Sequence, residues 1–138
     1  MTTPAFASKP RPEFRNIHVS QLLKYKLPPP GMVSILHRIS GAALFLTLPL
    51  ILWLFDLSLT SELSYARLAD FGAHWLVKLV LVGLAWSFLH HLIAGLRFLL
   101  LDLDVGVDKP AARTSALAVF AISLPLTLLA ALKIFGAF

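Results

Sequence analysis

The stretch Ser87–Asp102, SFLHHLIAGLRFLLLD, places two histidines and one arginine inside a segment that is otherwise apolar enough for lipid. Its length and apolarity indicate a membrane-spanning helix. Charged groups at the centre of a bilayer cost at least ~2.5 kcal/mol each unless something binds them. The default interpretation of His90, His91 and Arg97 is therefore functional.

Each of the two histidines has a small residue on its own helical face. Gly95 follows His91 by four residues, and Ala94 follows His90 by four. A flat, bulky group held by a histidine needs such a gap, because a larger side chain would collide with its plane. The pattern therefore favours haem, although a structural role is as well supported for His91 as ligation. The spacing alone does not choose between His90 and His91. His90 shares a face with Arg97, so an arrangement in which His90 engages polar groups while His91 faces a cofactor fits the sequence.

The composition places the chain among integral membrane proteins. Of 138 residues, 58% are hydrophobic and only 14% are charged, which lies outside the range of soluble domains. Three segments are long and apolar enough to cross a bilayer, at about 33–57, 74–101 and 113–135. We therefore predict an all-α fold, an integral membrane bundle of three transmembrane helices. Residues 1–30 are predicted to form a basic N-terminal arm and residues 31–138 the membrane domain.

Prolines and polar residues mark the boundaries of the first span. The run Pro28-Pro29-Pro30-Gly31 disfavours an earlier helix start, so the first span is expected to begin just after it. The segment Asp56–Asp70 is expected to be a short polar connection to the second span.

Basic residues are distributed unevenly around the spans, and this predicts the orientation in the membrane. The first connection holds Arg67, the second holds Lys109 and Arg113, and the arm holds Lys9, Arg11, Arg15, Lys24 and Lys26. The positive-inside rule then places the N-terminus in the cytoplasm and the C-terminus outside. The net charge of +5 is explained by this topology signal, so no nucleic-acid partner is expected.

The absence of cysteine restricts the cofactors that the chain can hold. Without thiols it has no disulfide, no thiolate-ligated iron-sulfur cluster and no covalently attached c-type haem. Any cofactor must be held by histidine or by packing.

A second polar cluster, made of Ser34, His37 and Arg38, lies in the first turns of the first span. A serine hydroxyl and a guanidinium one turn apart can donate to a carbonyl oxygen of a small molecule, and the cation can balance haem propionates. The alternative is that Arg38 snorkels to lipid phosphates and Ser34 bonds back to its own helix. For Arg97, snorkelling is the favoured role. At ~1.5 Å per residue, Arg38 and His91 lie at similar depths, so they can share a site.

These residues resemble the cytochrome b556 membrane-anchor subunit of succinate dehydrogenase, complex II. Three spans in the matching places extend the resemblance over essentially the whole chain. Its motifs are Arg11-Pro12, Ser34-x-x-His37-Arg38-x-Ser40-Gly41 and His91-x-x-x-Gly95-Leu96-Arg97-Phe98, with Asp102 at the end of the last.

The resemblance implies a role for each site residue. His91 would be an axial ligand of the iron of one haem b, with the second axial histidine supplied by a companion membrane subunit. Ser34 and Arg38 would help to form the ubiquinone site, and His37 and Arg38 would lie near the haem propionates.

The resemblance also implies the setting in which the chain works. Its partners would be a second membrane-anchor subunit, an iron-sulfur subunit and a flavoprotein subunit, in the lipid bilayer of a bacterial inner membrane. The chain would not be catalytic by itself, since it has no flavin-binding fingerprint and no cysteine for clusters. It would help to pass electrons from the iron-sulfur subunit to ubiquinone.

Two other functions remain as alternatives from the sequence. One is a haem-free anchor that holds a soluble enzyme at the membrane. The other is a small cation or proton transporter with Arg38, His90, His91 and Arg97 as a relay, against which the lack of an acidic residue at depth argues.

Overall fold

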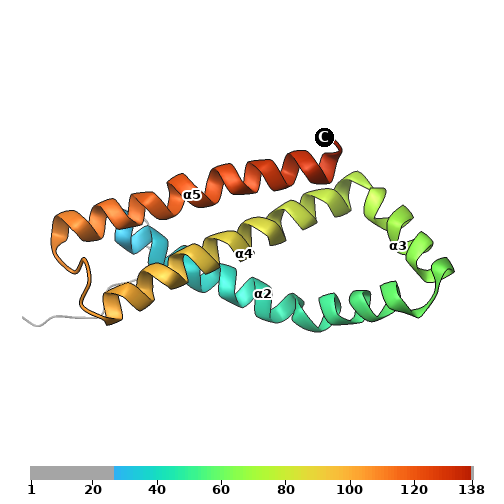
Figure 1. The fold of residues 1–138 in the computed structure, drawn as a ribbon, viewed down its shortest axis with the longest axis horizontal. Helices are drawn as coiled ribbons and strands as arrows, with labels where there is room; N and C mark the ends of the chain where they lie inside the picture. Colours follow the sequence, from blue (N-terminus) through green and yellow to red (C-terminus); the bar gives the residue numbers. More distant parts are fainter. Residues whose placement is uncertain (1–26, 138) are drawn as a thin grey trace, which may run out of the picture.

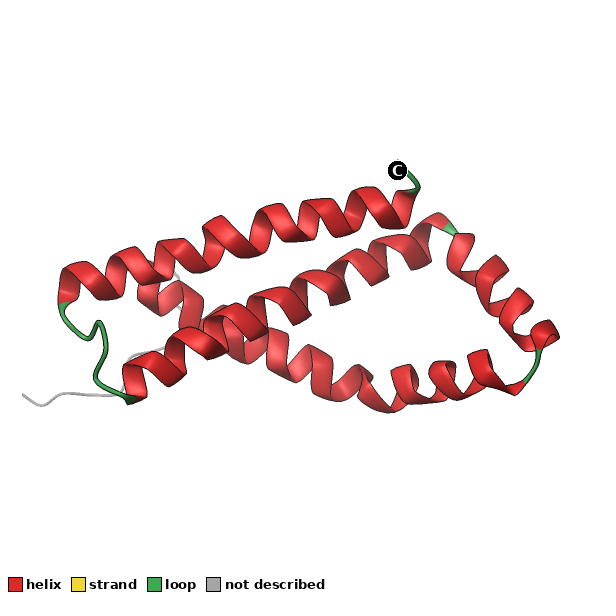
Figure 2. Ribbon diagram, in the orientation of Figure 1, coloured by secondary structure: helices red, strands yellow, loops and turns green. Residues whose placement is uncertain are grey.

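The structure is a computed structural model that describes residues 27–137, so most of the predicted basic arm, residues 1–26, lies outside the described residues. Four helices make up this part of the chain: α2 (Pro29–Thr60), α3 (Glu62–Ala73), α4 (Trp75–Asp102) and α5 (Lys109–Phe135). Short loops join them, and residues 27–137 contain no strand (Figure 2).

Three of these helices, α2, α4 and α5, are long and apolar enough to cross a membrane, with 32, 28 and 27 residues. At 1.5 Å per residue even the shortest extends about 40 Å, which exceeds the ~30 Å hydrocarbon layer and leaves polar ends in the interface. The prediction of an all-helical membrane bundle with three spans is confirmed. The chain is a multi-pass membrane protein.

The helices are arranged so that the two polar motifs share one end of the bundle. α4 and α5 run antiparallel side by side, and α2 crosses α4 (Figure 1). The beginning of α2, the end of α4 and the beginning of α5 therefore lie at the same end. α3 joins the far ends of α2 and α4, near the C-terminus (Figure 1).

The first helix begins earlier than the proline run predicts. α2 starts at Pro29, with Pro28 as its N-cap, so the run Pro28–Gly31 lies at the helix start and not before it. Proline is tolerated in the first turn because the amide hydrogen that it lacks would have had no partner within the helix. The expectation that the helix begins after Gly31 is therefore wrong by about three residues.

The predicted polar connection Asp56–Asp70 is also corrected, because most of it is helical. α2 continues to Thr60 and α3 starts at Glu62. Ser61 caps α3: its side chain accepts a hydrogen bond from the Ser64 amide at 3.1 Å, and the Ser64 hydroxyl accepts one from the Ser61 amide at 3.1 Å. This reciprocal capping, with Glu62 in the first turn beside the positive end of the helix dipole, stabilises a helix that a polarity pattern does not predict.

The centre of the bundle is small, and α4 contributes to it from a single stripe. Its fully or nearly buried residues are Ser87, His90, Ala94 and Arg97, spaced three and four apart as expected for one face of a helix. Ala94 packs with Val33 of α2 and with Ala116 and Val119 of α5. Ser40 of α2 and Ser123 of α5 are also buried. Small residues at these positions let the helix backbones approach closely, as is typical of membrane bundles.

Most large apolar side chains point outward instead. On α2, for example, Phe45 and Leu46 are 74% and 75% exposed within this chain. In a membrane protein such surfaces contact lipid or a neighbouring subunit, so exposure here does not indicate contact with water.

Candidate functional site

The structure brings together polar residues of α2 and α4 that lie more than 50 positions apart in the sequence. The imidazole rings of His37 and His91 stack with their centroids 4.1 Å apart and their planes 5° from parallel. We refer to His37, Ser40, Gly41 and His91 as the histidine site. It lies at the end of the bundle where α2 begins and α4 ends (Figure 1).

The hydrogen bonds of His91 determine which ring nitrogen carries the proton. Its Nδ1 lies 3.0 Å from the backbone carbonyl oxygen of His37 and 3.4 Å from Ser40 Oγ. The carbonyl can only accept, so the short contact requires a hydrogen on Nδ1. Ser40 itself donates to the same carbonyl oxygen at 2.9 Å. His91 Nε2 is then left with a free lone pair, which is the form of histidine that binds a metal.

Gly41 allows the two histidines to approach, while a side chain at Gly95 would make only an ordinary contact with His37. A Cβ placed on Gly41 would lie 2.7 Å from His91 Cε1, closer than real side chains come, so the His91 ring occupies the space that this glycine leaves. Gly95 on α4 faces His37, whose Nε2 lies 3.5 Å from the corresponding Cβ position. The sequence interpretation attached importance to Gly95, one turn after His91, and gave no role to Gly41 on the other helix.

A pocket of about 230 Å³ opens beside the histidine site, lined by Ser34, His37, Arg38 and Phe98. The three α2 residues that were predicted as a cluster therefore do line one space. Within residues 27–137, Arg38 has no ion-pair or hydrogen-bond partner, and Ser34 does not bond back to its own helix. A hydroxyl and a guanidinium are thus available to a ligand in this pocket.

Phe98, which the sequence analysis names only as part of a motif, is a lining residue of this pocket. Its ring lies 5.0 Å from the His37 ring, tilted by 57°, and 5.4 Å from the guanidinium carbon of Arg97. Its position seven residues after His91, on nearly the same helical face, is the signal that indicates this role.

His90 lies on a different face of α4 from its neighbour His91. It is 0% exposed and packs between the rings of Trp86, 5.3 Å away, and Phe120 of α5, 5.6 Å away. Neither ring nitrogen has a hydrogen-bond partner among the described residues. The expectation that His90 contacts polar groups is therefore wrong, because its ring packs against aromatic side chains. Because this chain alone encloses the ring, an external ligand does not reach it without repacking.

Arg97 has a structural contact in place of the snorkelling role expected from the sequence. It is only 7% exposed, and its Nε donates to Ser115 Oγ at 2.9 Å while Nη2 donates to the Ala112 carbonyl at 3.1 Å. Both acceptors belong to α5. Arg97 thus links α4 to α5 by hydrogen bonds, because the second loop brings the start of α5 beside the end of α4. The sequence pattern does not show this proximity.

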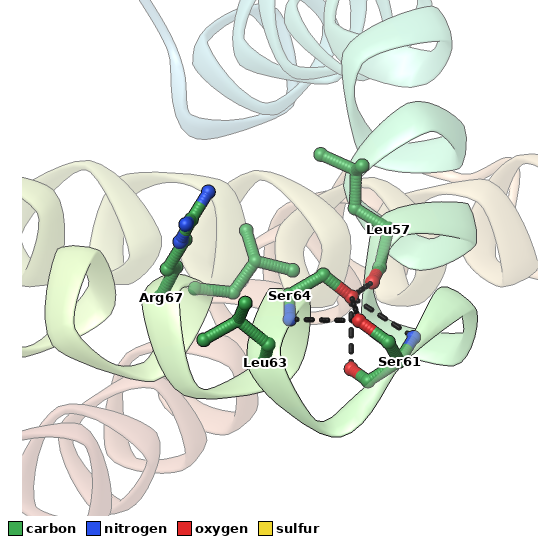
Figure 3. Close-up of a pocket in the computed structure, with 6 residues that line it drawn as sticks. Leu57, Ser61, Leu63, Ser64 and Arg67 are labelled. Carbon is green, nitrogen blue, oxygen red and sulfur yellow. Dashed lines mark hydrogen bonds between the residues drawn. The ribbon is translucent and has the colours of Figure 1, made fainter.

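A separate pocket of about 300 Å³ lies in the corner between α2 and α3, at the far end of the bundle (Figure 3). Leu57, Leu63 and Leu68 form its apolar wall, with Arg67 at one side. Its serines already bond to one another and to the Leu57 carbonyl, which Ser64 Oγ approaches at 2.6 Å (Figure 3). This pocket has no histidine and is far from His91, so it is not the predicted site.

Three helices long and apolar enough to cross a membrane, with His91, Arg38 and Ser34 toward one end of the bundle, define a multi-pass membrane protein. Comparison with known proteins identifies the family. Residues 10–130 match the family described as succinate dehydrogenase/fumarate reductase transmembrane subunit. The chain belongs to this family, whose members are membrane-anchor subunits of complex II.

Similar proteins carry a consistent name. The succinate dehydrogenase cytochrome b556 subunit of Coxiella burnetii is 38% identical over 104 residues, which cover 74% of this chain and 82% of the relative. That of Paracoccus denitrificans is 34% identical over 80% of this chain and 85% of the relative. That of Rickettsia felis is 31% identical over 76% and 82%.

The close approach at Gly41 leads to a stability prediction. Alanine normally stabilises a helix by about 0.5–1 kcal/mol relative to glycine, but overpacking a tight contact costs about 1–3 kcal/mol. Gly41→Ala should therefore lower the thermal midpoint of the purified protein. Gly83→Ala on α4 is the matched control, since nothing lies within 4 Å of its Cβ position and its midpoint should be unchanged or higher. Equal midpoints for both variants would contradict the contact between Gly41 and His91.

Proposed function

We propose that this chain is the haem b-binding membrane-anchor subunit of a succinate:ubiquinone oxidoreductase and helps to pass electrons from the iron-sulfur subunit to ubiquinone. The observation that carries the proposal is the state of His91. Its Nδ1 is held by the His37 carbonyl, and its Nε2 keeps a lone pair on a half-buried ring. A b-type haem bound there supplies one-electron transfer, while the protein supplies the ligand and its orientation.

The residues of the histidine site fit such a group. His91 is the one of the two adjacent histidines that is accessible from outside the chain, because His90 is enclosed. The described residues hold no group of three His, Cys, Asp or Glu side chains able to bind a bare metal ion. One histidine from this chain, a porphyrin and a histidine from a companion membrane subunit would instead complete the coordination of iron.

Arg38 and His37 are placed to balance the acidic groups of a haem. Arg38 is exposed at the membrane end of α2 and has no acidic partner among residues 27–137. Guanidinium pairs with carboxylates in a bidentate fashion, so haem propionates are suitable partners. The His37 ring, stacked on His91, lies in the same vicinity.

The ubiquinone site is proposed at the pocket of Ser34 and Arg38. Ubiquinone has two carbonyl oxygens on an apolar ring, and the pocket offers two free donors beside the aromatic ring of Phe98. Ser34 and Arg38 are one helical turn apart on α2, so both can reach one face of a bound ring. Ubiquinone is the substrate here, and the chain contributes binding groups to a site that companion subunits complete.

The ligand assignment is tested by two adjacent substitutions. A low-spin haem that loses one axial histidine becomes five-coordinate or is not retained. His91→Leu should therefore remove or shift the low-spin b-type bands in a dithionite-minus-oxidised spectrum of the purified complex. His90→Leu should keep them. The reverse pattern would contradict the assignment, and a wild-type complex without b-type bands would favour a haem-free anchor.

The quinone assignment is tested at Arg38. A hydrogen bond to a charged group contributes about 1.5–3 kcal/mol, so Arg38→Leu should slow quinone reduction roughly tenfold or more. Electron transfer from succinate to a soluble artificial acceptor upstream of quinone should persist. Arg67→Leu, an exposed arginine at the other end of the bundle, is the matched control and should leave both activities intact. Loss of both activities in Arg38→Leu would indicate failed assembly and not a quinone contact.

The location follows from the same proposal. The subunit would lie in a bacterial inner membrane with its N-terminus in the cytoplasm, where the histidine site would be near the iron-sulfur and flavoprotein subunits. The basic arm lies outside the described residues, so the orientation rests on the charge distribution. A reporter enzyme fused after Phe138 should be active on the outer side of the membrane. Cytoplasmic activity of that fusion would overturn the orientation.

A further inference from the structure

Three aromatic rings contact one another in series where α2 meets α4. The His37 ring of α2 stacks on the His91 ring of α4 with the centroids 4.1 Å apart, and the Phe98 ring of α4 lies 5.0 Å from the His37 ring. Phe98 follows His91 by seven residues, so the two α4 rings lie on nearly the same helical face. The one ring that α2 supplies is therefore contacted by two rings of α4. We refer to Phe98, His37 and His91 as the ring series.

The hydrogen bond that His91 Nδ1 donates to the His37 carbonyl does not by itself fix the plane of the His91 ring. One hydrogen bond restrains one ring atom. The χ2 torsion of histidine has a broad distribution, so rotamer preference leaves the ring plane free to turn. The stack does restrain the plane, because the His37 and His91 rings are only 5° from parallel. The plane of His91 therefore follows the plane of His37.

Phe98 is the neighbour of His37 that the rest of the bundle holds in place. Its side chain packs against the buried apolar core. The guanidinium carbon of Arg97 lies 5.4 Å from the centre of the Phe98 ring, a distance at which a cation attracts the face of an aromatic ring. Arg97 in turn donates hydrogen bonds to Ser115 and Ala112 of α5. A series of contacts thus leads from α5 through Arg97 and Phe98 to the His37 ring.

We propose that Phe98 is a positioning residue that holds the His37 ring against His91 and so fixes the plane of the His91 imidazole. The inference rests on the proposed ligation of haem iron by His91. Residues that do not touch a metal commonly orient the side chains that do. A flat ring at position 98 fixes the tilt of the neighbouring imidazole, whereas a flexible aliphatic side chain of similar size lets it turn.

The inference is tested by electron paramagnetic resonance of the oxidised purified complex. The largest g value of a low-spin haem with two histidine ligands depends on the angle between the two imidazole planes. Phe98→Leu should therefore shift or broaden this signal, and Phe98→Tyr, which keeps the ring, should retain the wild-type value. Phe88→Leu is the matched control, because Phe88 is an aromatic residue of the same helix that is 56% exposed. It should also retain the wild-type value.

A second background shows whether Phe98 acts through His37. His37→Ala removes the ring that links Phe98 to His91 but keeps the backbone carbonyl that accepts the His91 hydrogen bond. It should shift the g value on its own, and adding Phe98→Leu should then change the signal little, because coupled side chains give non-additive effects. A further shift as large as the one that Phe98→Leu causes in the wild type overturns the inference.

The remaining outcomes separate this inference from the proposed function. Phe98 also lines the pocket of Ser34 and Arg38. A Phe98→Leu complex with slower quinone reduction and an unchanged g value overturns the inference, because Phe98 then acts on the pocket and not on His91. A wild-type complex without a low-spin haem signal overturns the proposed function and the inference with it. If Phe98→Leu assembles poorly, Phe98→Met is measured instead, since methionine fills irregular space without a ring.

Discussion

The contact between the His91 imidazole and the backbone carbonyl of His37 is the interaction on which the site depends. It joins α2 to α4 at 3.0 Å and determines that Nδ1 carries the proton, which leaves Nε2 free. The contact is possible only because Gly41 has no side chain where the His91 ring lies. The hydrogen bond sets the tautomer of His91, and the glycine leaves the space in which the ring stacks on His37.

The rest of the bundle keeps α4 in the orientation that this contact requires. Its opposite face is held to α5 by Arg97, which donates to Ser115 and to the Ala112 carbonyl. In a medium without water, these polar pairs are among the few directional forces between helices, because apolar side chains contact lipid as well as they contact each other. Two successive histidines consequently have different surroundings. His90 is enclosed among aromatic rings, while His91 remains accessible.

The polar residues proposed to bind ligands lie on open surfaces of this chain. Arg38, Ser34 and the free nitrogen of His91 lie at one end of the bundle on surfaces that this chain leaves open, and its large apolar side chains also face outward. This arrangement fits a subunit of the succinate dehydrogenase/fumarate reductase transmembrane family, in which further subunits are expected to cover those surfaces.

The sequence by itself determined that the protein is helical and crosses a membrane three times. The length and apolarity of a segment are local properties, and they decide whether that segment can span the bilayer. It also indicated that Ser34, His37 and Arg38 share a space. The tertiary structure alone decided three other features. They are the helix α3, the hydrogen bonds from Arg97 to α5, and the packing of the His91 ring beside Gly41 and on the His37 ring. The first depends on a serine capping box that hydropathy does not register. The other two depend on which faces of separate helices meet, and that is set by crossing geometry and by hydrogen bonds between residues distant in the chain.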